Sequence, residues 1–211
     1  IALGKPGEIT ADELLNNADA AMYAAKDNGR HTACLFSPKS AQLIKERLQL
    51  RQEVFSALER RQFVLFYQPQ ISAANGAVVG AEALLRWKHP TLGFIPPSKF
   101  IPVAERTGLI NEVGGWVLER ACQDVLTWRR AGLGELVVAV NVSPVQFRRD
   151  DIEREVSNAL TLWHLPGTAL ELELTESLLV ADAQHVSELL QRLHGIGVKF
   201  AIDDFGTGYS N

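Results

Sequence analysis

Two adjacent carboxylates, Asp203 and Asp204, follow a short apolar segment near the end of the 211-residue chain. Residues 199–202 are typical of a short buried strand, and residues 205–210 form a loop rich in glycine and hydroxyl groups. Carboxylates at the rim of a core repel one another and lose hydration, so they need a cation or hydrogen-bond donors. The pair therefore indicates a site for hard metal ions, although Asp and Gly are also common in turns.

Three further polar side chains stand inside or at the ends of apolar segments. Glu82 lies within residues 78–85, Asn141 follows the valine-rich residues 136–140, and Glu173 lies in residues 170–174. The carboxyl ends of parallel strands meet at one mouth of a barrel, where we expect these side chains to join Asp203 and Asp204. Oxygen ligands without His or Cys favour Mg²⁺ or Mn²⁺, and two such ions about 3.5–4 Å apart would support phosphodiester hydrolysis.

Alternating strands and helices must position these residues. Residues 63–68 and 78–85 predict a hairpin that turns at Asn75-Gly76. From residue 109 on, helices at 109–131, 151–163 and 183–194 alternate with strands at 136–140, 170–174 and 199–202, and the proline-rich residues 95–102 read as a loop. This order predicts a parallel sheet covered by helices, which fits a barrel or an open doubly wound sheet. The polar strand ends and the absence of a GxGxxG loop favour a TIM-type barrel.

The first 61 residues have a different pattern. Thr10 and Glu13 form a capping box that predicts a helix to about Asp27, and residues 31–36 read as a strand. A unit of fewer than 40 residues has too little core to stand alone, so it predicts the tail of a larger domain. Residues 40–61 predict a helix, which is either a linker between two domains or the first helix of the second domain.

Composition excludes several classes of function. The net charge is −4 and there is no basic tract, which argues against a DNA or RNA polymer as partner. Cys34 and Cys122 form no CxxC pair, which argues against a zinc site or disulfides and favours a reducing cytoplasm. No apolar run in this piece reaches the length of a membrane span, and a membrane anchor upstream of it is left open.

Six segments, in order, resemble the motifs of the EAL domain family. They are YQP at 67–69, EALLRW at 82–87, FIPVAERTGLI at 100–110, NVSPVQF at 141–147, ELTES at 173–177 and DDFGTGYS at 203–210. The resemblance implies a phosphodiesterase that linearises cyclic di-GMP to pGpG. It also implies the fold class, an α/β modified TIM barrel with its first strand antiparallel, here partial and preceded by a short α/β tail.

The resemblance also implies roles for individual residues. Metal ligands would be Glu82, Asn141, Glu173 and Asp203 for one ion and Asp203 with Asp204 for the second. Gln68, Leu85 and Arg86 match substrate-contacting positions, and Glu176 matches the glutamate that supports the loop after Asp204. In the family this loop contributes to dimerisation, so a homodimer is expected.

The first 39 residues resemble the end of a GGDEF domain, which makes cyclic di-GMP from GTP. Lys26 and Arg30 match phosphate-contacting positions of that family, whereas His31 stands where asparagine is more usual. The expected organisation is a GGDEF tail at 1–39, a linker helix at 40–61 and the amino-terminal part of an EAL domain at 62–211.

Residues 62–211 are far fewer than the ~250 residues of a complete barrel. The family's water-activating lysine lies beyond the DDFGTGYS motif, so we expect the parent protein to be an enzyme and this chain alone to be inactive. The alternatives are a receptor that binds cyclic di-GMP without cleaving it, or a dimerising regulatory module. The intact set of metal ligands disfavours the receptor.

Overall fold

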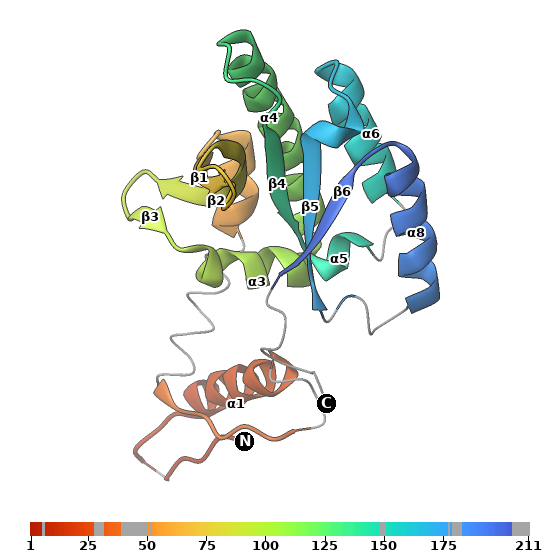
Figure 1. The fold of residues 1–211 in the computed structure, drawn as a ribbon. Helices are drawn as coiled ribbons and strands as arrows, with labels where there is room; N and C mark the ends of the chain where they lie inside the picture. Colours follow the sequence, from red (N-terminus) through yellow and green to blue (C-terminus); the bar gives the residue numbers. More distant parts are fainter. Residues whose placement is uncertain are drawn as a thin grey trace. The chain divides into compact units, whose positions relative to one another are not determined.

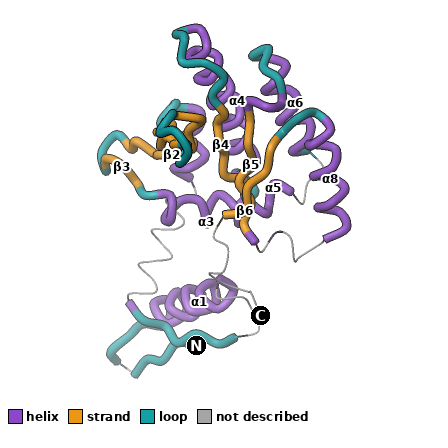
Figure 2. Tube along the Cα trace, viewed as in Figure 1, coloured by secondary structure: helices purple, strands orange, loops and turns teal. Residues whose placement is uncertain are grey.

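The computed structural model of the chain describes residues 1–5, 7–27, 32–38, 50, 52–147, 151–176, 178 and 183–203. The chain divides into two units, Ile1–Val54 and Phe55–Asn211. Figure 1 labels the helices and strands of both units, and Figure 2 colours them by type.

Among the described residues of the first unit, Ala11–Asp27 form the helix α1, whose start is capped as predicted. The Thr10 hydroxyl accepts a hydrogen bond from the Glu13 amide at 3.2 Å, and the Glu13 carboxylate accepts one from the Thr10 amide at 2.9 Å. This reciprocal pair satisfies amide groups that the first helical turn leaves without partners.

The predicted strand at 31–36 is wrong for the residues that the structure describes there, since 32–37 have no regular secondary structure. Two hydrogen bonds join this segment to Ile1: the Phe36 amide donates to the Ile1 carbonyl, and the Ile1 backbone nitrogen donates to the Cys34 carbonyl, both at 2.7 Å. An apolar segment becomes a strand only when a neighbouring strand supplies a continuous ladder of hydrogen bonds. Two hydrogen bonds to Ile1 do not form such a ladder.

The second unit is built on a mixed sheet in the order β1-β2-β4-β5-β6, with β3 (Gly93–Ile95) beside β2. The main strands are β1 (Phe63–Ile71), β2 (Val78–His89), β4 (Val137–Val142), β5 (Leu170–Thr175) and β6 (Lys199–Asp203). β1 and β2 pair antiparallel, and the pairs β2–β4, β4–β5 and β5–β6 are parallel. All five predicted strands are confirmed, and an antiparallel first strand before parallel strands agrees with the barrel-like fold.

Three helices cover the sheet along one face. α4 (Ile110–Arg130), α6 (Ile152–Leu162) and α8 (Ala183–Gly195) confirm the predicted helices and lie side by side in that order (Figure 1). The described part of this unit also contains two short elements, α5 (Pro144–Phe147) and the 3₁₀ turn η1 (Gly167–Ala169). Residues 52–59, which run from the end of the first unit into the second, are helical. None of the helices in the described part of the chain combines the length and apolar character that a membrane span needs.

The predicted loop at 95–102 is wrong, because most of it belongs to helix α3 (Pro97–Thr107). Pro97 occupies the first turn, where its missing N–H group costs nothing. Pro102 lies inside the helix and removes one backbone hydrogen bond, but Phe100, Val103 and Ala104 are buried and stabilise the helix by packing. Tertiary contacts therefore outweigh the local preference of the prolines.

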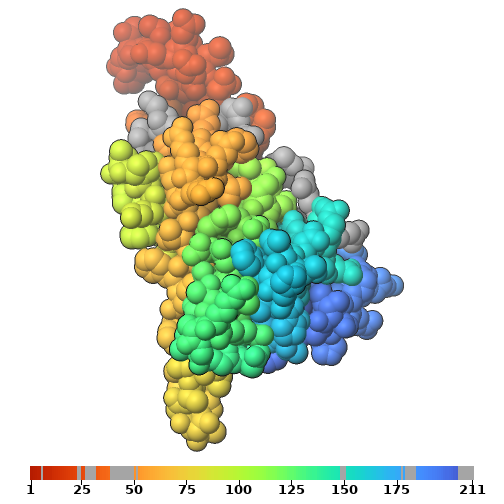
Figure 3. Space-filling view, turned by 90° about the horizontal axis from the view of Figure 1, so that it is seen from above, coloured from red at the N-terminus to blue at the C-terminus, as the bar shows by residue number. Residues whose placement is uncertain are grey.

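The core lies between the sheet and its helices, and β5 shows how the sequence divides the two faces of the sheet. Leu170, Leu172 and Leu174 are at most 1% exposed beneath the helices, whereas the residues between them are only half-buried. Figure 3 shows the turn of the β1–β2 hairpin (yellow) projecting from the surface. The helices thus bury one face of the sheet and leave the other for polar side chains.

Candidate functional site

The inner face, the face of the sheet turned away from Leu170, Leu172 and Leu174, collects the predicted polar residues. Opposed residues in neighbouring strands point to the same side of a sheet. Glu82 lies opposite Gln68 on one side and Ala139 on the other, and Asn141 lies opposite Glu173. Asp203 lies opposite Thr175, two residues after Glu173. The structure therefore brings Gln68, Glu82, Asn141, Glu173 and Asp203 to one face.

Asn141 and Glu82 are in direct contact across β4 and β2. The Asn141 side-chain amide donates a hydrogen bond to Glu82 Oε1 at 2.8 Å, although 59 residues separate them in the sequence. Parallel pairing of Gly80–Ala83 with Val137–Val140 sets this contact, because it brings the end of β4 next to Glu82. This hydrogen bond orients both side chains, with the amide nitrogen of Asn141 turned toward the carboxylate of Glu82.

Glu173 is the electrostatically strained residue of the set. Burial raises the pKa of its carboxyl group to about 7, with repulsion from Glu82, Asp203 and Glu171 and a hydrogen bond with Glu82 acting in the same direction. Loss of hydration and like charges both disfavour the ionised form. Among the described residues, the charges that act on Glu173 are therefore negative ones, from Glu82, Asp203 and Glu171.

The chemistry of these donors fits Mg²⁺ or Mn²⁺, since they are carboxylate and amide oxygens around Glu173, whose charge the described residues raise in energy rather than compensate. Within the described residues, however, no three Asp, Glu, His or Cys side chains are already arranged as a metal-binding group. Asp204, expected to complete the set, lies outside the described residues. The metal-binding role of each residue therefore stays a prediction.

The residues predicted to contact substrate fall on both faces of the hairpin. Arg86 shares the inner face with Glu82, its guanidinium carbon lies 5.9 Å from the centre of the Phe66 ring, and Nη1 donates to the Leu85 carbonyl at 2.9 Å. Leu85 lies opposite Leu65, so its side chain points to the helix-covered face. A contact between Leu85 and an inner-face ligand would thus involve its backbone. Glu176 directly follows β5, and the loop that it is expected to support lies outside the described residues.

Sequence reasoning singled out neither Glu105 nor Ser143, although both lie in quoted motifs. The Ser143 hydroxyl donates to Glu105 Oε1 at 2.7 Å, and the two residues are 38 positions apart. Ser143 is two residues after Asn141, so this bond joins the end of β4 to α3. A single sequence contains no pattern that would show these two motifs to lie next to each other in space.

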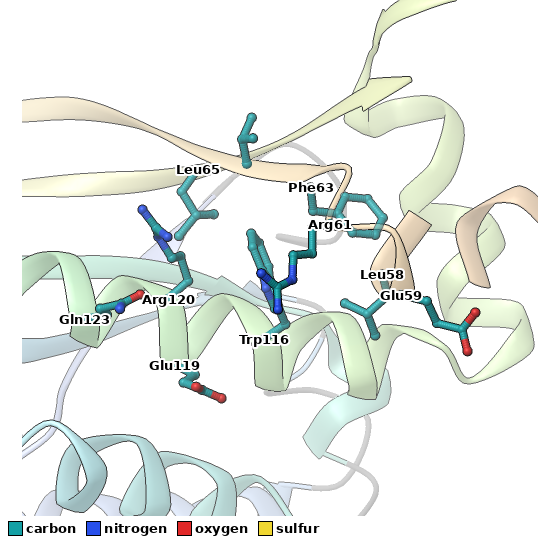
Figure 4. Close-up of a pocket in the computed structure, with 10 residues that line it drawn as sticks. Leu58, Glu59, Arg61, Phe63, Leu65, Trp116, Glu119, Arg120 and Gln123 are labelled. Carbon is teal, nitrogen blue, oxygen red and sulfur yellow. The ribbon is translucent and has the colours of Figure 1, made fainter. Parts of the chain in front are cut away.

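A pocket of about 650 Å³ lies on the outer side of β1, against α4. Figure 4 shows Trp116 and Arg120 of α4 pointing toward β1, with Phe63 and Leu65 on the strand. The described residues that line it come from 58–65 and 116–123 and include neither Glu82 nor Glu173, so this pocket is distinct from those carboxylates.

Comparison with known proteins matches residues 51–211 to the model of the EAL domain. Among curated proteins, the chain is 47% identical over 207 residues to "Bifunctional diguanylate cyclase/cyclic di-GMP phosphodiesterase MucR" of Pseudomonas aeruginosa, covering 98% of this chain and 30% of MucR. It is 42% identical over 200 residues to "Cyclic di-GMP phosphodiesterase NbdA" of the same organism, covering 95% of this chain and 26% of NbdA. The chain thus spans about a third or less of these relatives.

Solved structures give the same relationship. "PaMucR Phosphodiesterase, c-di-GMP complex" matches with a TM-score of 0.74 and 47% identity, over 77% of this chain and 66% of that one. The EAL domain of Mycobacterium smegmatis DcpA matches with a TM-score of 0.56 and 38% identity, over 70% of this chain and 58% of that one. Since the family model matches well over half of its residues, the chain belongs to the EAL domain family.

Proposed function

We propose that this chain is the EAL part of a larger signalling protein that hydrolyses cyclic di-GMP to linear pGpG with the help of Mg²⁺ or Mn²⁺. The observation that carries the proposal is the convergence of Glu82, Asn141 and Glu173 on one face, with the pKa of Glu173 raised to about 7. Similarity to MucR and NbdA, whose names state this phosphodiesterase activity, supports the choice of substrate.

Each predicted residue has a definite task in this proposal. Glu82, Asn141, Glu173 and Asp203 would hold one ion, and Asp203 with Asp204 would hold the second. Bound metal would supply a nucleophilic water at neutral pH and stabilise charge on the leaving oxygen. Arg86 would bind a phosphate of the dinucleotide, with Gln68 and Leu85 beside it, and Glu176 would support the loop after Asp204.

We also propose that residues 1–39 are the tail of a GGDEF domain, joined by a linker helix at 40–61 to the EAL domain from residue 62 onward. The name of MucR, which includes diguanylate cyclase activity and whose match covers 98% of this chain, supports this order. The protein would act as a homodimer in the cytoplasm. A receptor that binds without cleaving is less favoured, because Glu82, Asn141, Glu173, Asp203 and Asp204 are all retained.

The test uses the full-length protein that contains this chain, incubated with cyclic di-GMP and Mn²⁺ and followed by chromatography. Wild type is expected to release pGpG, and Glu82→Ala or Asp203→Ala should abolish this release while leaving circular dichroism unchanged. Glu171→Gln is the matched control, since it changes an inner-face carboxylate of β5 that is not a predicted ligand. It should retain activity within a few-fold.

Two results would overturn the proposal. Binding of cyclic di-GMP without release of pGpG would favour the receptor. Unchanged Mn²⁺ affinity of both alanine variants in calorimetry would remove the metal assignment.

A further inference from the structure

The chain is anchored immediately after Asn141. Ser143, the residue that follows β4, donates its hydroxyl hydrogen to Glu105 Oε1 at 2.7 Å and accepts a hydrogen bond from the Val145 amide at 3.2 Å. Glu105 lies in α3, which packs on α4 and β2. The hydroxyl of Ser143 thus connects the end of β4 to α3, a helix that is itself fixed by buried side chains.

A second group of contacts holds the same residue from the other side. Gln146 of α5 is only 4% exposed, and its Oε1 accepts a hydrogen bond from the backbone N–H of Ser143 at 3.1 Å. The backbone N–H of Gln146 donates to the Ser143 carbonyl at 3.0 Å. Gly114 of α4 leaves room for Gln146, because a Cβ atom at Gly114 would stand 2.0 Å from Gln146 Nε2. The backbone after Asn141 is therefore held by α3, α4 and α5 together.

This anchoring matters because Asn141 itself is exposed and packing does not hold its side chain. Its amide nevertheless donates to Glu82 Oε1 at 2.8 Å, which requires a defined backbone direction at the end of β4. Groups that orient a ligand residue commonly affect a metal site almost as strongly as the ligand residue does.

We propose that Glu105 and Ser143 are positioning residues, which hold the end of β4 so that the Asn141 side chain is aimed at Glu82 and at a divalent cation on the inner face. This inference rests on the proposed function. It gives a function to the hydrogen bond between Glu105 and Ser143, which belong to different sequence motifs and are 38 residues apart.

Calorimetric titration of the full-length protein with Mn²⁺ tests the proposal without requiring turnover. Glu105→Ala and Ser143→Ala each remove the bond and should weaken Mn²⁺ binding by about 10- to 100-fold. Glu105→Gln keeps an oxygen that can accept from Ser143 and should restore binding to near wild type. Thr107→Val is the matched control, because among the described residues its hydroxyl bonds to the Val103 and Ala104 carbonyls of its own helix.

A double variant separates positioning from a general loss of stability. If Glu105 acts through Asn141, then Glu105→Ala combined with Asn141→Ala should bind Mn²⁺ no more weakly than Asn141→Ala alone. Additive losses, or Glu105→Ala binding as tightly as wild type, would overturn the inference. An equal loss in Thr107→Val would also overturn it, since that loss would reflect the stability of α3.

Failure of the proposed function gives a different pattern. If Mn²⁺ binding shows the expected coupling but cyclic di-GMP is not cleaved, the phosphodiesterase proposal fails and the positioning role stands. If wild type binds no Mn²⁺, both fail together.

Discussion

The two faces of β5 differ sharply although one six-residue strand supplies both. On the outer face Leu170, Leu172 and Leu174 are almost fully buried under helices. On the inner face Glu171, Glu173 and Thr175 are half-buried, and the pKa of Glu173 is raised to about 7. Alternation along the strand places the apolar and the polar residues on opposite faces of the sheet. Burial of the leucines under the helices therefore leaves the polar side chains together on the inner face.

This difference separates stability from function within one strand. The outer face contributes stability through apolar burial, which requires no partner beyond the covering helices. The inner face holds the Glu173 carboxylate in a position that disfavours its charge. Changes on the two faces should therefore have effects of opposite sign on the free energy of unfolding.

The largest effect is expected on the outer face. Leu172→Ala should lower the free energy of unfolding by about 2–5 kcal/mol, because it removes buried methyl groups and leaves a cavity at a side chain with 0% exposure. Urea denaturation followed by circular dichroism measures this loss. A loss no larger than that of an exposed Leu162→Ala would contradict the importance of this face.

A change on the outer face of β1 should cause a smaller loss in the free energy of unfolding. The Tyr67 hydroxyl donates to Asp124 Oδ2 at 2.7 Å, and its ring stacks edge-on against Trp128 with centres 4.6 Å apart. Tyr67→Phe keeps the ring and removes the bond to a charged acceptor, so it should lower the free energy of unfolding by about 1.5–3 kcal/mol. Urea denaturation measures this loss of stability. An unchanged midpoint would contradict the prediction and show that the hydrogen bond from Arg120 alone is enough to satisfy Asp124.

On the inner face, Arg86→Ala should weaken cyclic di-GMP binding by about tenfold, the lower end of what a charged hydrogen bond contributes. Mn²⁺ affinity should not change, because Arg86 lies four residues beyond Glu82 on the same face and is no predicted metal ligand. Lys88→Ala removes the same charge two residues further along β2. Equal losses in the two variants would indicate general attraction of an anion.

The last expected effect has the opposite sign. The folded-state pKa of Glu173, about 7, exceeds its ordinary value of 4.5, so the folded protein holds this proton longer than the unfolded chain. The contribution of Glu173 to the stability of the metal-free protein is therefore fully present below about pH 4.5 and is lost as the pH rises through 7. Glu173→Gln should remove this decline and abolish stabilisation by Mn²⁺.

Urea denaturation at several pH values between 4.5 and 8, with a chelator and then with Mn²⁺, measures both parts of this prediction. Glu171→Gln on the same face is the control, and it should keep most of the decline with pH. A wild-type protein whose metal-free stability rises across this pH range relative to Glu173→Gln would contradict the assignment.

Sequence alone predicted the elements that follow a regular period and the strand ends that carry charge. The apolar run before Asn141 and the alternation around Glu173 were sufficient, because both patterns are local. Helix α3 was missed since Pro97 and Pro102 indicate a loop locally, and the buried contacts of Phe100 that overrule them come from distant residues. The bond between Glu105 and Ser143 was missed for the same reason.

The long span of the bond from Asn141 to Glu82 has a kinetic consequence. Gln68 meets Glu82 through a hairpin, a local pairing that closes a short loop, whereas Asn141 reaches Glu82 only when a connection of 59 residues has closed. Pairing between distant segments is the slow part of folding. The cation site on the inner face would thus form late, after the hairpin, and a bound ion would act mainly by slowing unfolding.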